Sequence, residues 1–222
     1  RLLDALPNAA GGSLVTADIA GTRLCYTVAE PGEHWVSNAL AVMAAVRAVG
    51  GDLGSAGLAL AEMGGLKGRG ARHRIPATGG HALVIDESYN ANPASMRATL
   101  RQLGQTPASR RVAVLGAMKE LGDFADKFHA QLAEPLALAD ADFVILVGDE
   151  MRSLAKVLDG ELGKAGEPSL GNAIPFAHCN SPQEAIEALN GFGITGGDAI
   201  LVKGSNSVGL GTLVAHFTSR ED

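Results

Sequence analysis

The sequence predicts an α/β protein whose main part is a doubly wound, mostly parallel, Rossmann-like sheet. Three observations support this prediction. Short, almost continuously apolar segments alternate with helix-like segments over most of the chain. A basic, glycine-rich stretch separates them from a differently organised first part. The 222 residues, 46% hydrophobic and 19% charged, suffice for one domain of ordinary size and part of a second.

The first part of the chain predicts a β-hairpin followed by two helices. Residues 13–28 alternate loosely around Ala20-Gly21, which is typical of two antiparallel strands joined by a tight turn. From Trp35 to Val49 the apolar residues recur with a helical period, and Gly50-Gly51 supplies a stop signal. A shorter helix is expected from Ser55 to Met63.

The stretch from Leu66 to Arg74 has the sequence LKGRGARHR and no apolar periodicity. We therefore place the domain boundary near Arg74, which gives domains 1–74 and 75–222. The glycines between Lys67 and Ala71 also predict a hinge that could absorb a backbone rotation between the two parts.

The second part alternates regularly between strand and helix candidates. The strand candidates are Ala82–Ile85, Val112–Leu115, Phe143–Val147, Pro175–Ala177 and Ala199–Val202, and helices are expected to begin near Pro93, Phe124, Glu150, Ser181 and Val208. In such a fold, ligands bind beyond the carboxyl ends of the parallel strands. Polar, charged and glycine residues follow each strand candidate, so we expect the functional site there.

The most distinctive segment is DESYNANPASM, which runs from Asp86 to Met96. A strand delivers Asp86 to its carboxyl end, Tyr89 and Asn90 follow in a loop, and Asn92-Pro93 begins a helix as N-cap and first-turn proline. A carboxylate, an aromatic ring and amides together suit an adenosine. The same residues would also serve as a capped helix whose asparagines satisfy turn geometry, and both interpretations stay open at this point.

Bulk properties exclude several classes of protein. The net charge is -6 and Lys and Arg are scattered, so nucleic acid is not expected as a partner. Apolar runs such as Phe143–Val147 are far too short to span a bilayer, and the amino terminus does not have the pattern of a signal peptide, so we expect a cytoplasmic protein without membrane insertion. Cys25 and Cys179 have no metal-ligand spacing, and we expect two buried thiols.

Five motifs, in order, resemble those of MurF-type Mur ligases. The SYNANP segment is similar to that family's first strand-to-helix turn in its carboxyl-terminal domain. The other four also match in order and spacing: PGEHWVSNALAV (Pro31–Val42), KGRG (Lys67–Gly70), VLGAMKELG (Val114–Gly122) and LVKGSN (Leu201–Asn206). The resemblance implies that the first part is the end of a central ATP-binding domain and that the second is the Mur ligase carboxyl-terminal domain.

The resemblance also implies roles for individual residues. Asn38 would contact adenine, Arg69 would reach the nucleotide from between the domains, and Asp86 would bind the ribose. The nucleotide edge would be lined by Tyr89, Asn90 and Pro93. The pair Lys203 and Ser205 would face the substrate and hold a carboxylate. Glu120 and His129 match family positions without an assigned chemistry, and no residue is assigned as catalytic or as a metal ligand.

This sequence departs from the family pattern in three respects. Asn206 replaces the usual arginine and Ala117 the usual aspartate, which puts the grip on the incoming dipeptide's carboxylate in doubt unless Arg72 or Arg74 supplies it. No segment fits the phosphate-binding pattern GxxxxGK[ST]. The resemblance therefore implies that the phosphate loop and the Mg²⁺ ligands lie upstream, and we expect half a site, inactive alone and prone to self-association through an exposed sheet edge.

The function implied by the resemblance is ATP-dependent amide bond formation. ATP would phosphorylate a carboxylate of UDP-N-acetylmuramoyl-tripeptide, and the amine of D-alanyl-D-alanine would attack the acyl phosphate to give a peptidoglycan precursor. One alternative is another Mur ligase or a folylpolyglutamate synthase, although those typically show a DYAHNP-like turn. Another is an α/β binding module without catalysis.

Overall fold

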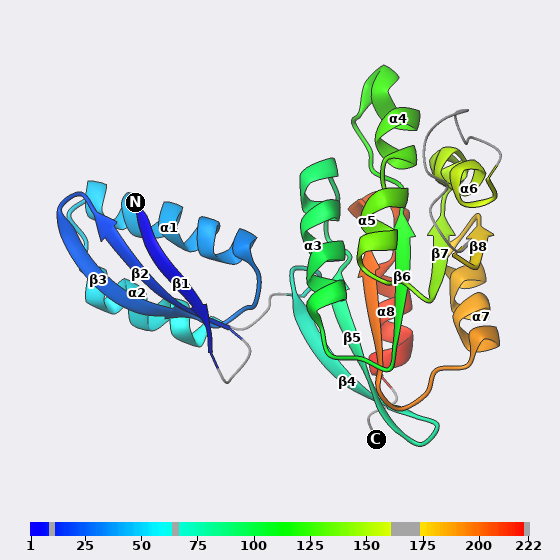
Figure 1. The fold of residues 1–222 in the computed structure, drawn as a ribbon, viewed down its shortest axis with the longest axis horizontal. Helices are drawn as coiled ribbons and strands as arrows, with labels where there is room; N and C mark the ends of the chain where they lie inside the picture. The colour runs from blue at the N-terminus through cyan, green and yellow to red at the C-terminus, as the bar shows by residue number, and fades with distance from the viewer. Residues whose placement is uncertain (9–11, 64–66, 161–173, 220–222) are drawn as a thin grey trace. The chain divides into compact units, whose positions relative to one another are not determined.

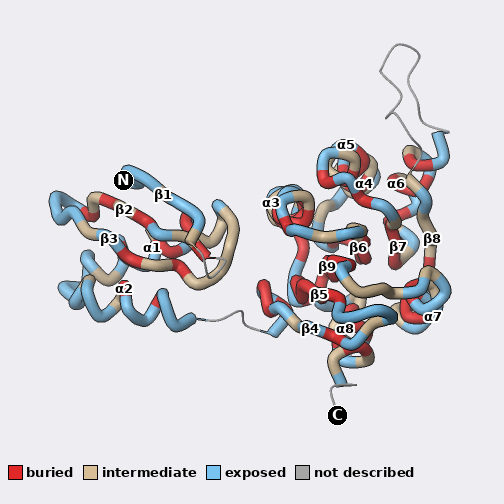
Figure 2. Tube along the Cα trace, turned by 60° about the horizontal axis from the view of Figure 1, so that its bottom comes forward, coloured by how far each residue is buried: buried red, intermediate tan, exposed pale blue. Residues whose placement is uncertain are grey.

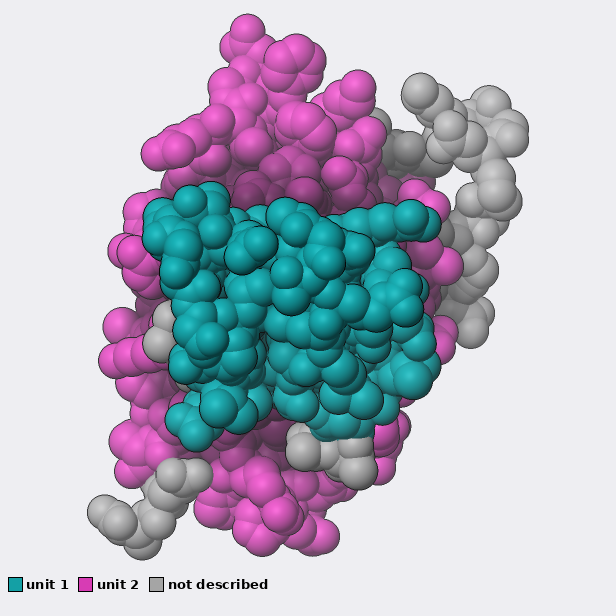
Figure 3. All heavy atoms as spheres, turned by 90° about the vertical axis from the view of Figure 1, so that its left-hand side faces the viewer, with its two compact units in different colours: residues 1–65 teal, residues 66–222 magenta. Residues whose placement is uncertain are grey.

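The computed structural model describes residues 1–8, 12–63, 67–160 and 174–219 of the chain. It divides into two compact units, Arg1–Gly65 and Leu66–Asp222, which Figure 3 distinguishes by colour. Each unit has its own hydrophobic core. Among the described residues, no helix combines the length and the hydrophobicity needed to cross a membrane.

The first unit is a three-stranded antiparallel sheet with two helices packed on it (Figure 1). The strand order is β1-β2-β3, and the predicted hairpin and both predicted helices are confirmed. β1 was not predicted, because its sequence LLDALP has no apolar alternation. The elements are β1 (Leu2–Pro7), β2 (Ser13–Ile19), β3 (Thr22–Val28), α1 (Glu33–Ala48) and α2 (Leu53–Glu62).

The turn of the hairpin lies at Ala20 and Gly21, where the sequence predicted it. Ala20 and Gly21 both take positive φ, 50° and 84°, between the paired residues Ile19 and Thr22. Two successive left-handed residues are what a two-residue turn needs to match the twist of the flanking strands. The strands then place alternate residues, among them Val15, in the core against α1.

The second unit is a six-stranded sheet with the order β4-β5-β9-β6-β7-β8. β4 pairs antiparallel with β5, and every other pairing is parallel, so the predicted doubly wound, mostly parallel sheet is confirmed. Its strands are β4 (Ala71–Ala77), β5 (Gly80–Glu87), β6 (Arg110–Gly116), β7 (Phe143–Val147), β8 (Phe176–Cys179) and β9 (Asp198–Lys203).

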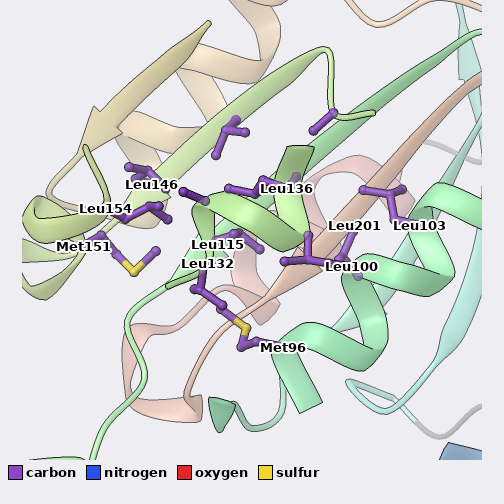
Figure 4. Close-up of a cluster of buried hydrophobic side chains, with 14 of the residues drawn as sticks. Met96, Leu100, Leu103, Leu115, Leu132, Leu136, Leu146, Met151, Leu154 and Leu201 are labelled. Atoms are coloured by element: carbon purple, nitrogen blue, oxygen red, sulfur yellow. The ribbon is translucent and has the colours of Figure 1, made fainter. Parts of the chain in front are cut away.

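Helices cover both faces of this sheet, as Figures 1 and 2 show. One layer contains α3 (Pro93–Gln105), α4 (Ala125–Ala130), α5 (Ala133–Leu138) and α6 (Arg152–Leu158), and the other contains α7 (Pro182–Phe192) and α8 (Gly211–Thr218). Each layer encloses its own cluster of buried apolar side chains. Figure 4 shows the first cluster, in which leucine and methionine side chains from α3, α5 and the sheet meet. The short helix α5 was not predicted.

The division between the units falls between Gly65 and Leu66, earlier than the boundary near Arg74 that the sequence suggested. The reason is β4, whose residues pair with β5 from Ala71↔Asp86 onward. Gly70 continues this attachment by donating its N–H to the Asp86 carbonyl at 2.8 Å. The stretch expected to act as a hinge is therefore bound to the second unit.

An ion pair joins two strands at the amino end of the sheet. Arg110, which begins β6, donates from Nε and Nη2 to the two carboxylate oxygens of Asp198 at 2.9 and 2.6 Å. The Thr195 N–H donates to Asp198 Oδ2 at 2.7 Å. Burial alone would raise the pKa of Asp198, but the hydrogen bonds from Arg110 and Thr195 outweigh it and lower this pKa. The pair fixes β9 against β6.

The two cysteines differ in exposure, which corrects one expectation. Cys179 ends β8 and is buried, and burial raises the pKa of its thiol. Cys25 is exposed, because it lies on β3 between residues that face the helices, so its own side chain points to the opposite face of the sheet. Both are free thiols.

Candidate functional site

The family-matched residues of the second unit gather at the carboxyl ends of β5, β9 and β6. β5 ends at Glu87, β9 at Lys203 and β6 at Gly116, and the three strands are adjacent in the parallel part of the sheet. The segment after β5 meets the segment before β4 here, because β4 runs antiparallel to β5. Four separate stretches of sequence thus meet at the edge where a doubly wound sheet binds its ligands.

Asp86 holds two of these stretches together. Its side chain is buried, and its Oδ2 accepts a hydrogen bond of 2.8 Å from the Gly68 N–H. Its Oδ1 accepts from the N–H and the hydroxyl of Ser88, at 3.1 and 2.6 Å. Gly68 has a φ of 74°, and a Cβ there would lie 2.8 Å from the Cβ of Tyr89, so glycine is required. The carboxylate is committed to the protein's own donors.

Arg69 and Tyr89 form a stacked pair on this anchored loop. The Arg69 guanidinium lies 4.1 Å from the centre of the Tyr89 ring. The Tyr89 N–H donates to the Gly68 carbonyl at 3.0 Å, which sets the ring beside the arginine. Arg69 is exposed and Tyr89 is 48% exposed, so a planar cation and an aromatic edge both face solvent.

The loop then runs through Asn90 into α3. Asn90 is exposed, and its side-chain oxygen accepts from the Ala91 N–H at 2.8 Å. Asn92 is the N-cap: its side chain accepts from the Ser95 N–H, and the Ser95 hydroxyl accepts from the Asn92 N–H, which completes a capping box. Pro93 is half-buried at the first helical position.

Lys203 supports the same loop from beneath. Its side chain is 2% exposed, and its Nζ donates to the Asn90 carbonyl at 2.8 Å and lies 3.6 Å from Glu87 Oε2. Burial lowers the pKa of Lys203, the Glu87 carboxylate opposes this effect, and the Arg69 charge adds to it. The substrate-facing role assigned to Lys203 stays a prediction, and the contacts seen here are with the protein.

Glu87 is a site residue that the sequence analysis did not select. It follows Asp86 directly, so its side chain points to the opposite side of β5 and forms the ion pair with Lys203. The signal was present as two adjacent carboxylates at a strand end. Which of them turns inward depends on the neighbouring loop that Asp86 binds, and that loop is fixed only by the fold.

Ser205 lies on the β9 side of the site and binds the loop after β6. The Ser205 hydroxyl accepts a hydrogen bond from the Lys119 N–H at 2.9 Å. The Lys119 side chain forms an ion pair with Glu150, which follows β7, and this lowers the pKa of Glu150. Gly116 and Gly204 approach so closely that a Cβ on Gly204 would lie 2.9 Å from the Gly116 Cα.

The residues at which the chain departs from the family pattern differ in burial. Ala117 is fully buried between β6 and the neighbouring strands, whereas Asn206 is exposed beside Ser205. Arg72 and Arg74 lie on β4, and both are exposed. Arg72 pairs with Ile85, near the carboxyl end of β5, and is the better placed of the two arginines.

Asn38 belongs to the first unit. It lies on α1, one turn after Glu33 and His34, and it is exposed. It is therefore available to a ligand on that unit. The structure brings Arg69, Asp86, Tyr89, Asn90, Pro93, Lys203 and Ser205 to one end of the second unit.

The second unit is thus a doubly wound α/β domain with an exposed Arg-Tyr pair and a buried lysine at the carboxyl ends of its strands. The family model described as "Mur ligase, glutamate ligase domain" matches residues 72–206, so the chain belongs to the Mur ligase family.

Relatives and solved structures agree with this membership. The UDP-N-acetylmuramoyl-tripeptide–D-alanyl-D-alanine ligase of Synechocystis sp. is 34% identical over 194 residues, which cover 84% of this chain and 37% of that protein. A crystal structure of MurF from Acinetobacter baumannii superposes with a TM-score of 0.76 at 25% identity, covering 99% of this chain and 44% of that one. MurF from Thermotoga maritima, solved with ADP, shares the fold with a TM-score of 0.72 at 20% identity and covers 98% and 45%. The chain thus spans well under half the length of the proteins that it matches.

Proposed function

We propose that this chain provides the nucleotide side and the dipeptide side of a MurF-type active site. The reaction is the ATP-dependent joining of D-alanyl-D-alanine to UDP-N-acetylmuramoyl-tripeptide in peptidoglycan synthesis. The observation that carries the proposal is the anchored Arg69–Tyr89 pair next to the Asn90 loop and Lys203. Residues from three family-matched motifs contribute to this one cluster.

The residues present fit an adenine nucleotide. The exposed guanidinium of Arg69 can bind phosphate oxygens in a bidentate manner, and the exposed edges of Tyr89 and Asn90 can border the nucleoside. Because Asp86 already accepts three hydrogen bonds, we propose that it acts on the ribose side indirectly, by positioning Arg69 and Tyr89. On the first unit, we propose that the exposed amide of Asn38 contacts adenine.

The dipeptide side would use Ser205 and the charge of Lys203. In the hydrogen bond from Lys119, the Ser205 hydroxyl accepts, so its own hydrogen can be donated to a carboxylate. Lys203 would act through the field of its buried ammonium and through the Asn90 carbonyl that it holds. ATP, when bound, supplies the phosphoryl group that activates the acceptor carboxylate for attack by the dipeptide amine. The residues described here orient these partners.

Mg²⁺ is part of the proposal only through ATP. The described ranges contain no group of three or more His, Cys, Asp or Glu side chains that could hold a metal ion. As for Mur ligases in general, we propose that the protein works in the cytoplasm.

The test is phosphate release from ATP with UDP-N-acetylmuramoyl-tripeptide and D-alanyl-D-alanine present. It is run on this chain alone and after adding the part of the Synechocystis ligase that this chain does not match. Release that needs both substrates and occurs only in the mixture supports the proposal, whereas release by this chain alone contradicts the half-site. No phosphate release in either arm, or release that needs neither substrate, contradicts the proposal. Replacing the dipeptide with glutamate separates this function from that of another amide ligase.

A further inference from the structure

The loop after β6, residues 117–121, is held from three sides. The Ala117 N–H donates to the Val147 carbonyl on β7 at 3.1 Å. The Met118 N–H donates to Nε2 of His129 at 2.9 Å. The Lys119 N–H donates to the Ser205 hydroxyl at 2.9 Å. Three successive amides thus bind three different elements, and only the middle one depends on a titratable side chain.

His129 lies on α4 and is fully buried. Its second ring nitrogen, Nδ1, lies 2.8 Å from the Ala125 carbonyl oxygen. A backbone N–H can only donate and a carbonyl can only accept, so Nε2 must be bare and Nδ1 must carry the hydrogen. The partners therefore define a neutral imidazole in one tautomer. If Nε2 were protonated, its N–H would point at the Met118 N–H, and this hydrogen bond would be lost.

The loop needs such support because its backbone is strained. Glu120 has a φ of 63°, a left-handed conformation that is unfavourable for a residue with a side chain. Glu120 follows Lys119 directly, so the strain lies next to the amide that binds Ser205. Met118 and Lys119 are consecutive, and fixing one amide fixes the direction of the next.

We infer that His129, in its neutral form, is a positioning residue for the dipeptide side of the site. It acts through the Met118 amide, which sets the Lys119 amide, which in turn orients the Ser205 hydroxyl. This role rests on the proposed function. His129 touches no substrate itself.

Charged groups from three elements face the imidazole. Asp126 on α4 and Glu150 after β7 favour its charged form, and Lys119 on the loop disfavours it. Burial of the ring is the largest influence on the pKa of His129 and lowers it, whereas the hydrogen bond to the Ala125 carbonyl and the two carboxylates oppose this effect without reversing it. The net shift favours the neutral form that the geometry requires.

Two substitutions test whether the hydrogen-bond acceptor at the place of His129 Nε2 matters apart from the rest of the imidazole ring. In His129→Gln the amide oxygen can reach the place of Nε2, whereas in His129→Asn it reaches only the place of Nδ1. We expect His129→Gln to keep the Met118 amide protected from hydrogen exchange and His129→Asn to lose that protection. Equal protection of Met118 in both variants would overturn the inference.

The ligase assay gives the functional readout. We expect His129→Asn to raise the KM for D-alanyl-D-alanine on the order of 10–100-fold while the KM for ATP stays unchanged, and His129→Gln to restore it. Leu136→Ala, a buried change in the same helical layer, controls for lost stability. Equal effects of all three substitutions would overturn the positioning role. These assays use the mixture with the part of the Synechocystis ligase that this chain does not match. If the wild type has no ligase activity in that mixture, the proposed function fails, whereas hydrogen exchange still decides whether His129 holds the loop.

Discussion

The carboxylate of Asp86 accepts hydrogen bonds from Gly68 and from both donors of Ser88, and only 1% of the residue is exposed. It therefore stabilises two loops that are distant in sequence. Because both of its oxygens are in use, its contribution to the site is indirect, through Gly68 and the residues on either side. A single buried acceptor here determines where Arg69 and Tyr89 stand.

We expect Asp86→Asn to destabilise the second unit by about 1–3 kcal/mol, because the amide would turn a donor toward either Gly68 or Ser88. Urea unfolding would measure this change. Asp159→Asn, at an exposed position, is the matched control and should leave the midpoint within experimental error. An equal shift in both variants would mean that the Asp86 hydrogen bonds contribute nothing.

The buried imidazole of His129 should make stability depend on pH. Burial lowers the pKa of His129 in the folded protein, so the unfolded chain binds more protons than the folded one just below the ordinary histidine pKa. The stability that the neutral imidazole contributes to the folded protein is fully present above about pH 6.5 and is lost as the pH falls below that value. Urea unfolding between pH 5 and pH 8 should show a steeper slope for the wild type than for His129→Gln. Parallel slopes would contradict this.

At the residue scale, the sequence indicated which residues would lie near one another, whereas their roles stay predictions. Tyr89, Asn90 and Ser205 follow apolar strands, and a parallel sheet brings such positions together. What each side chain binds was not predictable. The choice between Asp86 and its neighbour Glu87 depends on which side of β5 meets the Gly68 loop, and that contact joins residues far apart in the chain.

At the scale of elements, the N-terminus of α3 belongs to the candidate site, because the loop that carries Tyr89 and Asn90 ends at the N-cap of this helix. Asn92 caps α3 with a full capping box, and Ser181 caps α7 through its hydroxyl, which accepts a hydrogen bond from the Glu184 N–H. Both caps follow a strand of the parallel part of the sheet. Only the first lies in the loop that carries Tyr89 and Asn90, so equal losses of helix stability should have unequal consequences for function.

We expect Asn92→Ala and Ser181→Ala each to cost about 1 kcal/mol, the usual value of an N-cap, as measured by thermal unfolding. Only Asn92→Ala should also weaken the binding of an adenine nucleotide, because only that cap orients the Asn90 loop. Isothermal titration with ADP would compare them. A matching loss of affinity in Ser181→Ala would trace the effect to stability alone.

The ion pair between Arg110 on β6 and Asp198 on β9 is a second feature at this scale. Asp198 is fully buried, so Arg110→Met would leave its carboxylate unpaired in the interior. We expect a loss of about 3–5 kcal/mol in unfolding free energy, and a partial recovery in the double variant Arg110→Met, Asp198→Asn, which removes the buried charge. A double variant no more stable than the single one would contradict this account.

Most elements of the second unit were predictable because their strands are apolar throughout. β4 was not, since only every fourth residue, Ala71 and then Ile75, is buried and its charged residues suggest a linker. It becomes a strand because β5 offers a free edge and because Asp86 ties down the Gly68 loop that precedes it. The contacts that make β4 a strand are tertiary, so the local sequence pattern does not contain them.

At the scale of the whole molecule, the exposed edge of the first unit invites association. β1 is an edge strand, and Leu2, Leu3 and Leu6 on it are 42%, 38% and 55% exposed. Sheet edges of this kind pair readily with other chains. We propose that copies of the chain associate through β1.

We expect light scattering to show a mass that rises with concentration, and Leu6→Lys to reduce that rise, because a lysine on an edge strand disfavours pairing. Leu58→Lys, at an exposed position on α2, is the control for added charge. A concentration-independent mass for the wild type would contradict the proposal, as would an equal response to both substitutions.

The narrow approach between Gly116 and Gly204 has an evolutionary consequence. A Cβ on Gly204 would lie 2.9 Å from the Gly116 Cα and from Leu210, and one on Gly116 would lie 3.0 Å from Leu210 and Val208, so a side chain at either position would force its neighbours to move. A mutation at one glycine therefore cannot be rescued by a change at the other. While the neighbouring Asn206 and Lys119 diverge, this pair of glycines should persist, and it should mark the same crossing of backbones in related chains whose surrounding residues no longer resemble one another.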